Sequence, residues 1–434
     1  MRSALLSTGA RVVTMAVSLV CGVLTARLIL GQAGVDYYAL FSLLVAVPGL
    51  IAFSDLGAGA VVVNSIASSR DVRNDALLAR QAVTVMRVQL MFAASLTAVN
   101  LLLLLTGGWN LVLGSAAVVP GADLAAFACL CLFALTICLG IWQRVLLGLG
   151  RNPLVILLQG IVSPLSLLLV WIMLGTDDER IKSLLALASF TATLVAAILG
   201  FVVASRYSGA LLPRAARRLA RPRRHPGAQV MDVGWPMLAQ LLSTPLAMVL
   251  PRFILAQFAT ALAVAQYGVA GQVFFALQAL VAAAGVTLWP AFTRARSRGE
   301  LRAGPGLISV AFAAGLAATT AVILAIGPWL FGLISNDELT IGPELILAFG
   351  AMVTVQAALY PLGMFIMDKR GIRFQVAPAL LMAASTVSLT ILFVPSLGVL
   401  APPLANAVSV VVFQLVPYAW YIRRHRRRLY GDEA

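Results

Sequence analysis

Charged residues are scarce in this chain. Only 11% of its 434 residues are Asp, Glu, Lys or Arg, whereas a soluble domain averages about 25%. Hydrophobic residues make up 61%, and a soluble protein this apolar could not cover its own core. The solvent that fits is a lipid bilayer, in which one helical span needs about 20 mostly apolar residues. The shortage of charge excludes a soluble globular domain and predicts an all-α integral membrane protein.

Histidine and cysteine are also rare, with two and four copies. The cysteines have neither Cys-x-x-Cys spacing nor a histidine nearby, so they indicate neither a zinc site nor a disulfide framework. Both histidines, His225 and His425, lie in basic segments, and no paired carboxylates suggest acid–base catalysis. We therefore expect no catalytic residue, no metal and no cofactor.

Acidic residues are outnumbered by basic ones, and the formal net charge is +15. No segment resembles a nucleic-acid-binding module, and the basic residues cluster between apolar runs. Cytoplasm-facing loops of membrane proteins collect Lys and Arg. The basic balance therefore indicates membrane topology, with membrane lipids as partners and no nucleic acid.

Long apolar runs follow one another along the chain. The run 111–120 is too short to cross a bilayer, so it should lie in an outer loop or lengthen its neighbours. Twelve longer runs predict transmembrane helices at 8–30, 39–60, 82–106, 124–147, 154–174, 181–204, 233–258, 264–289, 307–330, 343–367, 374–394 and 398–421.

The loops between these runs alternate in charge. Arginines gather at 70–80, 151, 206–224, 294–302, 369–373 and 423–428, while the intervening loops are mainly acidic. The basic loops should face the cytoplasm. This alternation supports the count of twelve independently of hydropathy, and it predicts that both termini are cytoplasmic.

A hydrophilic stretch at 206–229 divides the chain near its middle. It is rich in Arg and Pro and lacks apolar periodicity, which predicts a basic cytoplasmic linker; a patch for anionic lipids is a second interpretation. The predicted organisation has six spans on each side. It comprises a first lobe at 1–205, the linker at 206–229, a second lobe at 230–422 and a basic cytoplasmic tail at 423–434.

A weak internal repeat crosses this linker. The first half has RLILGQ at 27–32 and the second half has RFILAQ at 252–257, each at the outer end of its first helix. Tyr38 and Tyr267 then open the following spans. Equal topology in two halves predicts a parallel repeat with a pseudo-two-fold axis along the membrane normal.

Several segments resemble a known superfamily. In the first half they are ARLILG at 26–31, FSDLG at 53–57 and NSIA at 64–67, and in the second half PRFIL at 251–255 and WPAF at 289–292. In this order they resemble the multidrug/oligosaccharidyl-lipid/polysaccharide exporter superfamily, and within it the O-antigen and exopolysaccharide flippases. Two departures are Pro251, where many relatives have an acidic residue, and the lack of Arg or Lys near Asn64.

This resemblance implies two six-helix lobes that face one another across a central cavity. It implies alternating access and, as cargo, a polyprenyl-diphosphate-linked oligosaccharide that is moved across the bacterial inner membrane for cell-surface polysaccharide assembly. Polysaccharide polymerase and export proteins are the partners that it suggests. The expected count of twelve spans, without two more at the C-terminus, argues against the peptidoglycan-precursor flippase subgroup.

Five arginines fall inside or at the rims of the predicted spans. A diphosphate needs cations beside a wet cavity, and arginine bonds phosphate oxygens bidentately while keeping its charge. The alternative is snorkelling of the side chains to lipid headgroups. Sixteen residues separate the two arginines of the first span, so they lie roughly 160° apart and can share a cavity only if that helix bends. The candidates are Arg11, Arg87 and Arg144 near the inner side, and Arg27 and Arg252 near the outer side.

Other polar and helix-breaking residues inside spans are further candidates. Asp55 could couple transport to a proton or sodium gradient, although pairing with Arg11 is the favoured interpretation. Pro236, Pro245 and Pro251 could form a hinge in the seventh span. The in-span amides bond either sugar hydroxyls or neighbouring helices. These amides are Gln89, Gln143, Gln159, Gln240, Gln272, Gln278, Gln356, Asn406 and Gln414.

Two other functions are alternatives to a flippase. A membrane glycan polymerase or ligase needs a site at the membrane face, often on a long outer loop, and the outer loops here are short. A multidrug antiporter of the same superfamily often exports cations, which arginines in the cavity would repel. The sequence therefore favours a transporter that is not an enzyme, with a flippase first and the antiporter and the polymerase or ligase as alternatives.

Overall fold

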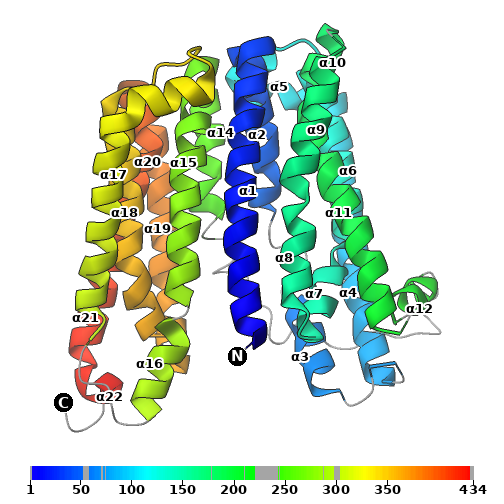
Figure 1. The fold of residues 1–434 in the computed structure, drawn as a ribbon, viewed down its shortest axis with the longest axis vertical. Helices are drawn as coiled ribbons and strands as arrows, with labels where there is room; N and C mark the ends of the chain where they lie inside the picture. The colour runs from blue at the N-terminus through cyan, green and yellow to red at the C-terminus, as the bar shows by residue number, and fades with distance from the viewer. Residues whose placement is uncertain are drawn as a thin grey trace. The chain divides into compact units, whose positions relative to one another are not determined.

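The protein is helical throughout the part that the computed structural model describes (Figure 1). That part comprises residues 2–51, 58–69, 72, 73, 75–176, 178–209, 211–219, 243, 245–286, 288–297 and 304–430. No strand occurs among these residues, which confirms the prediction of an all-α protein. The chain divides into two compact units, residues 1–241 and 242–434.

Unit 1 is a bundle in which each long helix contacts the next. Helix α1 packs on α8 and α9, α9 packs on α11, α11 packs on α6, and α6 packs on α4. Its elements are α1 (Arg2–Gln32), α2 (Val35–Leu50), α3 (Ala58–Ser68), α4 (Ala76–Leu105), α5 (Gly108–Leu113), the 3-10 turn η1 (Gly114–Val118), α6 (Ala122–Leu139), α7 (Ile141–Gly148), α8 (Asn152–Gly160), α9 (Val162–Leu174), α10 (Glu179–Ser183), α11 (Ala186–Tyr207) and α12 (Leu211–Arg218).

Unit 2 is arranged around α18, which contacts α15, α17 and α20. Helix α19 lies between α20 and α14 and contacts both. The elements are α14 (Leu250–Phe258), α15 (Ala261–Val286), α16 (Leu288–Ser297), α17 (Gly306–Ser335), α18 (Pro343–Phe365), α19 (Lys369–Leu397), the 3-10 turn η2 (Gly398–Leu400), α20 (Ala401–Val410), the π turn η3 (Val411–Leu415), α21 (Val416–Arg424) and α22 (Arg426–Tyr430).

Nine helical stretches of the described residues are long and apolar enough to cross a membrane. The ninth, Arg370–Arg424, has 55 residues and holds α19, α20 and α21. After a turn at Gly398, α20 packs on α19, and Tyr421 of α21 stacks on Phe374 of α19. Gly398 has φ +55°, a left-handed conformation that suits glycine. The predicted second and seventh spans include residues outside the described part, so twelve remains a prediction.

Large apolar side chains are exposed along these spans. Leu105, Leu307 and Trp171 are 76%, 81% and 61% exposed, respectively. Continuous apolar exposure of this kind is unsuited to water and suits contact with lipid chains. The surface therefore supports the multi-pass membrane assignment that the composition predicts.

Several predicted spans are broken rather than straight. Helix α8 gives way to α9 at Ile161, and Pro164 has no N–H to donate to the Gly160 carbonyl four residues earlier. The π turn Val411–Leu415 precedes Pro417, which cannot bond the Phe413 carbonyl. In each case the proline removes one helical hydrogen bond where the regular α-helix is interrupted.

Part of the predicted linker is a helix, which corrects the sequence interpretation. Helix α11 runs to Tyr207, and α12 buries Leu211, Leu212 and Ala215 on one side. This side packs against α4. The prediction of a stretch without apolar periodicity was wrong for this segment, because three apolar residues at helical spacing suffice to dock a short helix.

The short run at 111–120 does not cross the unit as a span. It forms the end of α5 and the turn η1, and this region is fastened by Asn100 of α4. Asn100 is completely buried; its Oδ1 accepts from Trp109 Nε1 at 3.2 Å, and its Nδ2 donates to the Phe127 carbonyl at 2.9 Å. The prediction that this run is too short to span is confirmed.

Asp75 fixes the start of α4, and its loss should destabilise unit 1. Its Oδ1 accepts from the backbone N–H groups of Leu77 and Leu78 at 3.0 Å each, and its Oδ2 accepts from the Ser69 hydroxyl at 3.0 Å. The Leu78 N–H, with smaller contributions from Ser69 and Leu77, holds the pKa of Asp75 below its ordinary value. We expect Asp75→Ala to cost about 1 kcal/mol of unfolding free energy at neutral pH.

The measurement is thermal unfolding of the purified protein across pH. A carboxyl group whose pKa is lowered by folding stabilises the folded protein at pH values above its unfolded pKa of about 3.9. This stabilisation is lost as the pH falls through the pKa of the group in the folded protein. The difference between wild type and Asp75→Ala should therefore shrink below about pH 4. Asp75→Asn keeps a good helix cap and serves as the control. Equal stability of wild type and Asp75→Ala at pH 7 would contradict this role.

Candidate functional site

The two candidate cations of the first span lie on one uninterrupted helix. Helix α1 runs from Arg2 to Gln32 and contains no proline. Arg11 is exposed and Arg27 is half-buried. Because the helix has no break, their separation of roughly 160° places them on different sides. Arg27 is therefore the stronger candidate for a polar site in unit 1.

Arg87 and Arg144, the other two cations of unit 1, are both half-buried. Arg87 Nη2 donates to the Arg218 carbonyl at 3.2 Å, which ties α4 to the end of α12. This bond gives Arg87 a structural role, because it holds the end of α12 against α4. Arg144 lies on α7, which packs against α3 and α11.

Arg252 lies in the first turn of α14 in unit 2. Its guanidinium carbon is 5.4 Å from the ring centre of Tyr267 on α15, close enough for a cation–π contact. Tyr267 is buried and its ring centre lies 5.0 Å from that of Phe349 on α18. The aromatic cluster thus gives Arg252 a fixed platform, and the edge of the guanidinium plane is the part suited to bonding an anion.

A buried asparagine supports the bend just before Arg252. Pro251 has no N–H, so the Ala247 carbonyl four residues earlier loses its usual helical partner. Asn406 of α20, which is 1% exposed, donates from Nδ2 to this carbonyl at 3.2 Å. Asn406 therefore supplies the bond that Pro251 removes.

Asn406 is the end of a chain of three amides. Gln356 of α18 donates from Nε2 to Asn406 Oδ1 at 2.6 Å, and Gln278 of α15 donates from Nε2 to Gln356 Oε1. The amides link α15, α18 and α20 to residue 247 beside α14. Of the two roles considered for in-span amides, these three have bonds between neighbouring helices.

Three of the sequence candidates fall where the structure is not described. Asp55 and Pro236 lie outside the described residues, as does Gln240. Pro245 and Pro251 are described and both are buried. The roles of Asp55 in ion coupling or in pairing with Arg11 stay predictions.

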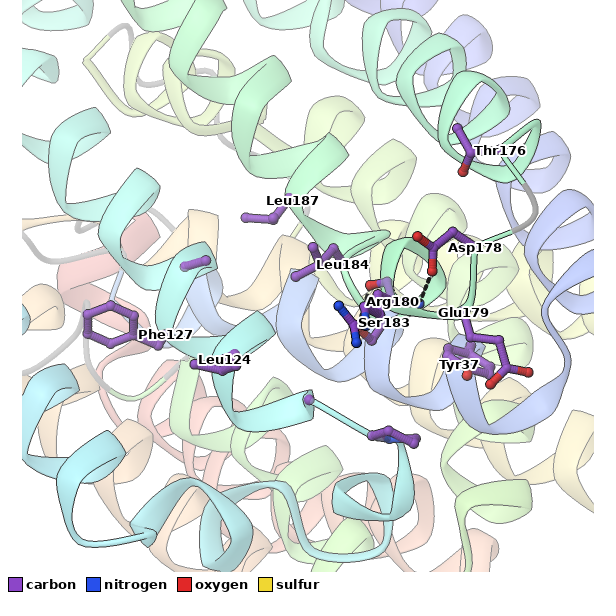
Figure 2. A pocket seen from close by; sticks show the side chains of 13 residues that line it. Tyr37, Leu124, Phe127, Thr176, Asp178, Glu179, Arg180, Ser183, Leu184 and Leu187 are labelled. Carbon is purple, nitrogen blue, oxygen red and sulfur yellow. Dashed lines mark hydrogen bonds between the residues drawn. The ribbon is translucent and has the colours of Figure 1, made fainter.

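Unit 1 contains a pocket of about 1180 Å³ (Figure 2). Its apolar wall is formed by Leu124, Phe127 and Ala128 of α6 together with Leu184 and Leu187. These residues come from segments that are about 60 positions apart in the sequence and meet because α6 packs on α11. The wall resembles the predominantly apolar lining of sites for small organic ligands.

The rim of this pocket is polar and comes mainly from the segment around α10. It includes Thr176, Asp178, Glu179, Arg180 and Ser183. Asp178 caps α10, because its Oδ1 accepts from the Arg180 backbone N–H at 2.9 Å (Figure 2). Sequence reasoning treated this segment only as an outer loop and missed the pocket. The sequence does show a charged loop followed directly by the apolar run 184–187. The part of α6 that completes the pocket is far from this run in the sequence, so only the folded structure shows it.

Comparison with known proteins assigns the family. A family model described as "Polysaccharide biosynthesis protein" matches residues 1–296, which is more than half of the chain. No curated protein matches the sequence significantly.

Solved structures of similar fold include transporters and a flippase. An inward-facing multidrug resistance MATE family transporter of the MOP superfamily has a TM-score of 0.68 and 17% identity, covering 98% of this chain and 100% of that one. Lipid II flippase MurJ in an inward closed conformation has a TM-score of 0.69 and 13% identity, covering 96% and 87%. An outward-facing MATE transporter has a TM-score of 0.59 and 15% identity, covering 100% and 96%. The chain therefore has the fold of the MOP superfamily and belongs to the polysaccharide biosynthesis protein family.

Proposed function

We propose that this chain is a flippase that moves a polyprenyl-diphosphate-linked oligosaccharide across the bacterial inner membrane for cell-surface polysaccharide assembly. The observation that carries the proposal is the family match over residues 1–296 in a chain whose described residues include nine membrane-length helical stretches. The fold shared with a lipid II flippase adds support, since that protein is named for a lipid cargo.

The chemistry of such a cargo matches the arginines of the two units. A polyprenyl diphosphate joins an apolar chain to a strongly anionic group, and the anion cannot cross hydrocarbon without cations. Arg27 and Arg252 occupy corresponding places in the sequence repeat, and both are half-buried. We assign the diphosphate contacts to these two. Arg11, Arg144 and Arg87 are proposed to serve the inner side, where Arg87 also holds α12.

The fold alone does not separate this proposal from a drug antiporter. The MATE transporter and MurJ have TM-scores of 0.68 and 0.69, which are equal for this purpose. The family description favours polysaccharide assembly, and the arginine content disfavours cationic drugs. Alternating access between two lobes, coupling through Asp55, hinge motion at Pro245 and Pro251, and association with polymerase or export proteins are parts of the same proposal.

The experiment is reconstitution of the purified chain in liposomes. Lipid-linked oligosaccharide from the host would be placed on one leaflet, and an impermeant lectin would report its appearance on the other. We expect movement that depends on the protein, and no gradient-driven uptake of a cationic dye. Dye uptake without movement of the glycan lipid would contradict the flippase proposal and favour a multidrug antiporter.

A further inference from the structure

We propose that the pocket of unit 1 binds an anionic lipid, with its phosphate at Arg180 and an apolar chain against α6 and the start of α11. This site is separate from Arg27 and Arg252 and does not depend on the flippase proposal.

The pocket lies at the level where membrane spans end. The span Asn152–Leu174 ends just before the rim, and the spans Ala122–Gly148 and Ala186–Tyr207 begin beside it. The loop that carries the rim belongs to the set that the charge pattern predicts to be external. Phospholipid phosphates occupy this boundary between hydrocarbon and water.

The lining has an apolar and a polar side, as an amphipathic ligand requires. Leu124, Phe127 and Leu187 face it from the helices, and Ser183 and Thr176 belong to the polar rim. Among the described residues that line the pocket there is no Asn or Gln. A free sugar is therefore a poor fit, because its many hydroxyls would face aliphatic carbon without amide partners.

The charge that faces the apolar wall is positive. Figure 2 shows the Arg180 side chain reaching toward the side where Leu124 and Phe127 lie. In the same view the Glu179 carboxylate lies on the opposite side from Leu124 and Phe127, and Asp178 is engaged in capping α10. A guanidinium next to an aliphatic wall suits a phosphate that carries a hydrocarbon chain.

The test is lipid retention by the purified full-length chain, measured by native mass spectrometry. The probes are phosphatidylglycerol, a polyprenyl monophosphate and, as the neutral reference, phosphatidylcholine. Arg180→Gln removes the charge and keeps much of the side-chain length. Lys182→Gln is the matched control, since it removes the same charge from the same short helix at a position outside the pocket.

We expect retention of anionic lipid to fall about tenfold or more in Arg180→Gln, as for loss of a charged hydrogen bond, and to persist in Lys182→Gln. Preference for phosphatidylglycerol would identify a bulk membrane lipid, and preference for the polyprenyl phosphate would identify a lipid carrier. Equal retention by wild type and Arg180→Gln, or equal retention of neutral and anionic lipids, would overturn the proposal. Neither result bears on the glycan-flipping assay, which uses no Arg180 variant.

Discussion

Replacing both Arg27 and Arg252 with alanine should abolish movement of the glycan lipid while the protein still folds. Each charged hydrogen bond to the diphosphate is worth about 1.5–3 kcal/mol, so each loss should slow flipping by about tenfold to a hundredfold. Both arginines are proposed to contact the diphosphate during transport. We therefore expect the double variant to fall to the background of empty liposomes in the lectin assay.

A second variant, with lysine at both positions, separates the role of charge from that of the guanidinium geometry. Lysine keeps the charge but cannot bond two phosphate oxygens in a planar fork, so activity should lie between wild type and the alanine variant. Arg80→Ala is the matched control, because Arg80 is an exposed arginine on the predicted cytoplasmic side of α4. Full activity of the Arg27→Ala and Arg252→Ala double variant would remove these arginines from the site.

Loss of Asn406 should destabilise unit 2, and the loss should depend on Pro251. Asn406→Leu leaves the Ala247 carbonyl without the Asn406 amide, and it leaves the Gln356 Nε2 group with only Met248 Sδ as an acceptor. The loss of a hydrogen-bond partner costs about 1–3 kcal/mol for a buried polar group. Pro251→Ala returns an N–H that can bond the Ala247 carbonyl. The cost of Asn406→Leu should therefore be smaller in the Pro251→Ala background.

A double-mutant cycle on thermal or denaturant unfolding measures this dependence. Residues that share a partner show coupling of about 0.5–3 kcal/mol, whereas distant pairs add. The control is a second double-mutant cycle that pairs Asn406→Leu with Pro361→Ala. Pro361 also lies inside a helix, α18. The hydrogen bonds described for the Asn406 side chain go to Gln356, Ala247 and Met248. Additive effects of Asn406→Leu and Pro251→Ala would show that the asparagine does not substitute for the missing N–H.

This dependence matters for function because the bend directly precedes Arg252. The bond from Arg252 N to the Val249 carbonyl, at 3.1 Å, spans three residues rather than four, so the first turn of α14 is tight. Asn406 holds residue 247 on the other side of that turn. A change at Asn406 should therefore reduce flipping more than its effect on stability alone accounts for.

Hydropathy predicted several of the membrane-length helices closely. The runs 307–330 and 343–367 correspond to α17 (Gly306–Ser335) and α18 (Pro343–Phe365), because length and apolarity define a span without reference to its neighbours. The internal breaks were harder to predict. Gly140 separates α6 from α7 inside one predicted span, and glycine alone does not specify where a membrane helix bends.

The candidate sites depended on information that one sequence does not contain. Arg87 has a bonding partner on α12, a helix that was read as part of a linker. Gln278, Gln356 and Asn406 were recognised as polar positions, but the choice between cargo and neighbouring helices requires their rotational phase in the packed unit. Arg180 was assigned only to an outer loop, since its pocket is completed by α6.

The central claim is that the chain moves a lipid-linked glycan outward. The direct measurement is the location of this glycan lipid in spheroplasts of a host lacking the gene, probed with an impermeant lectin or oxidant. The account predicts accumulation of a protected, inward-facing intermediate that wild type restores to the outer face and the Arg27→Ala and Arg252→Ala double variant does not. Normal arrival of the intermediate at the outer face, with only the polymer missing, would contradict the account and favour a polymerase or ligase.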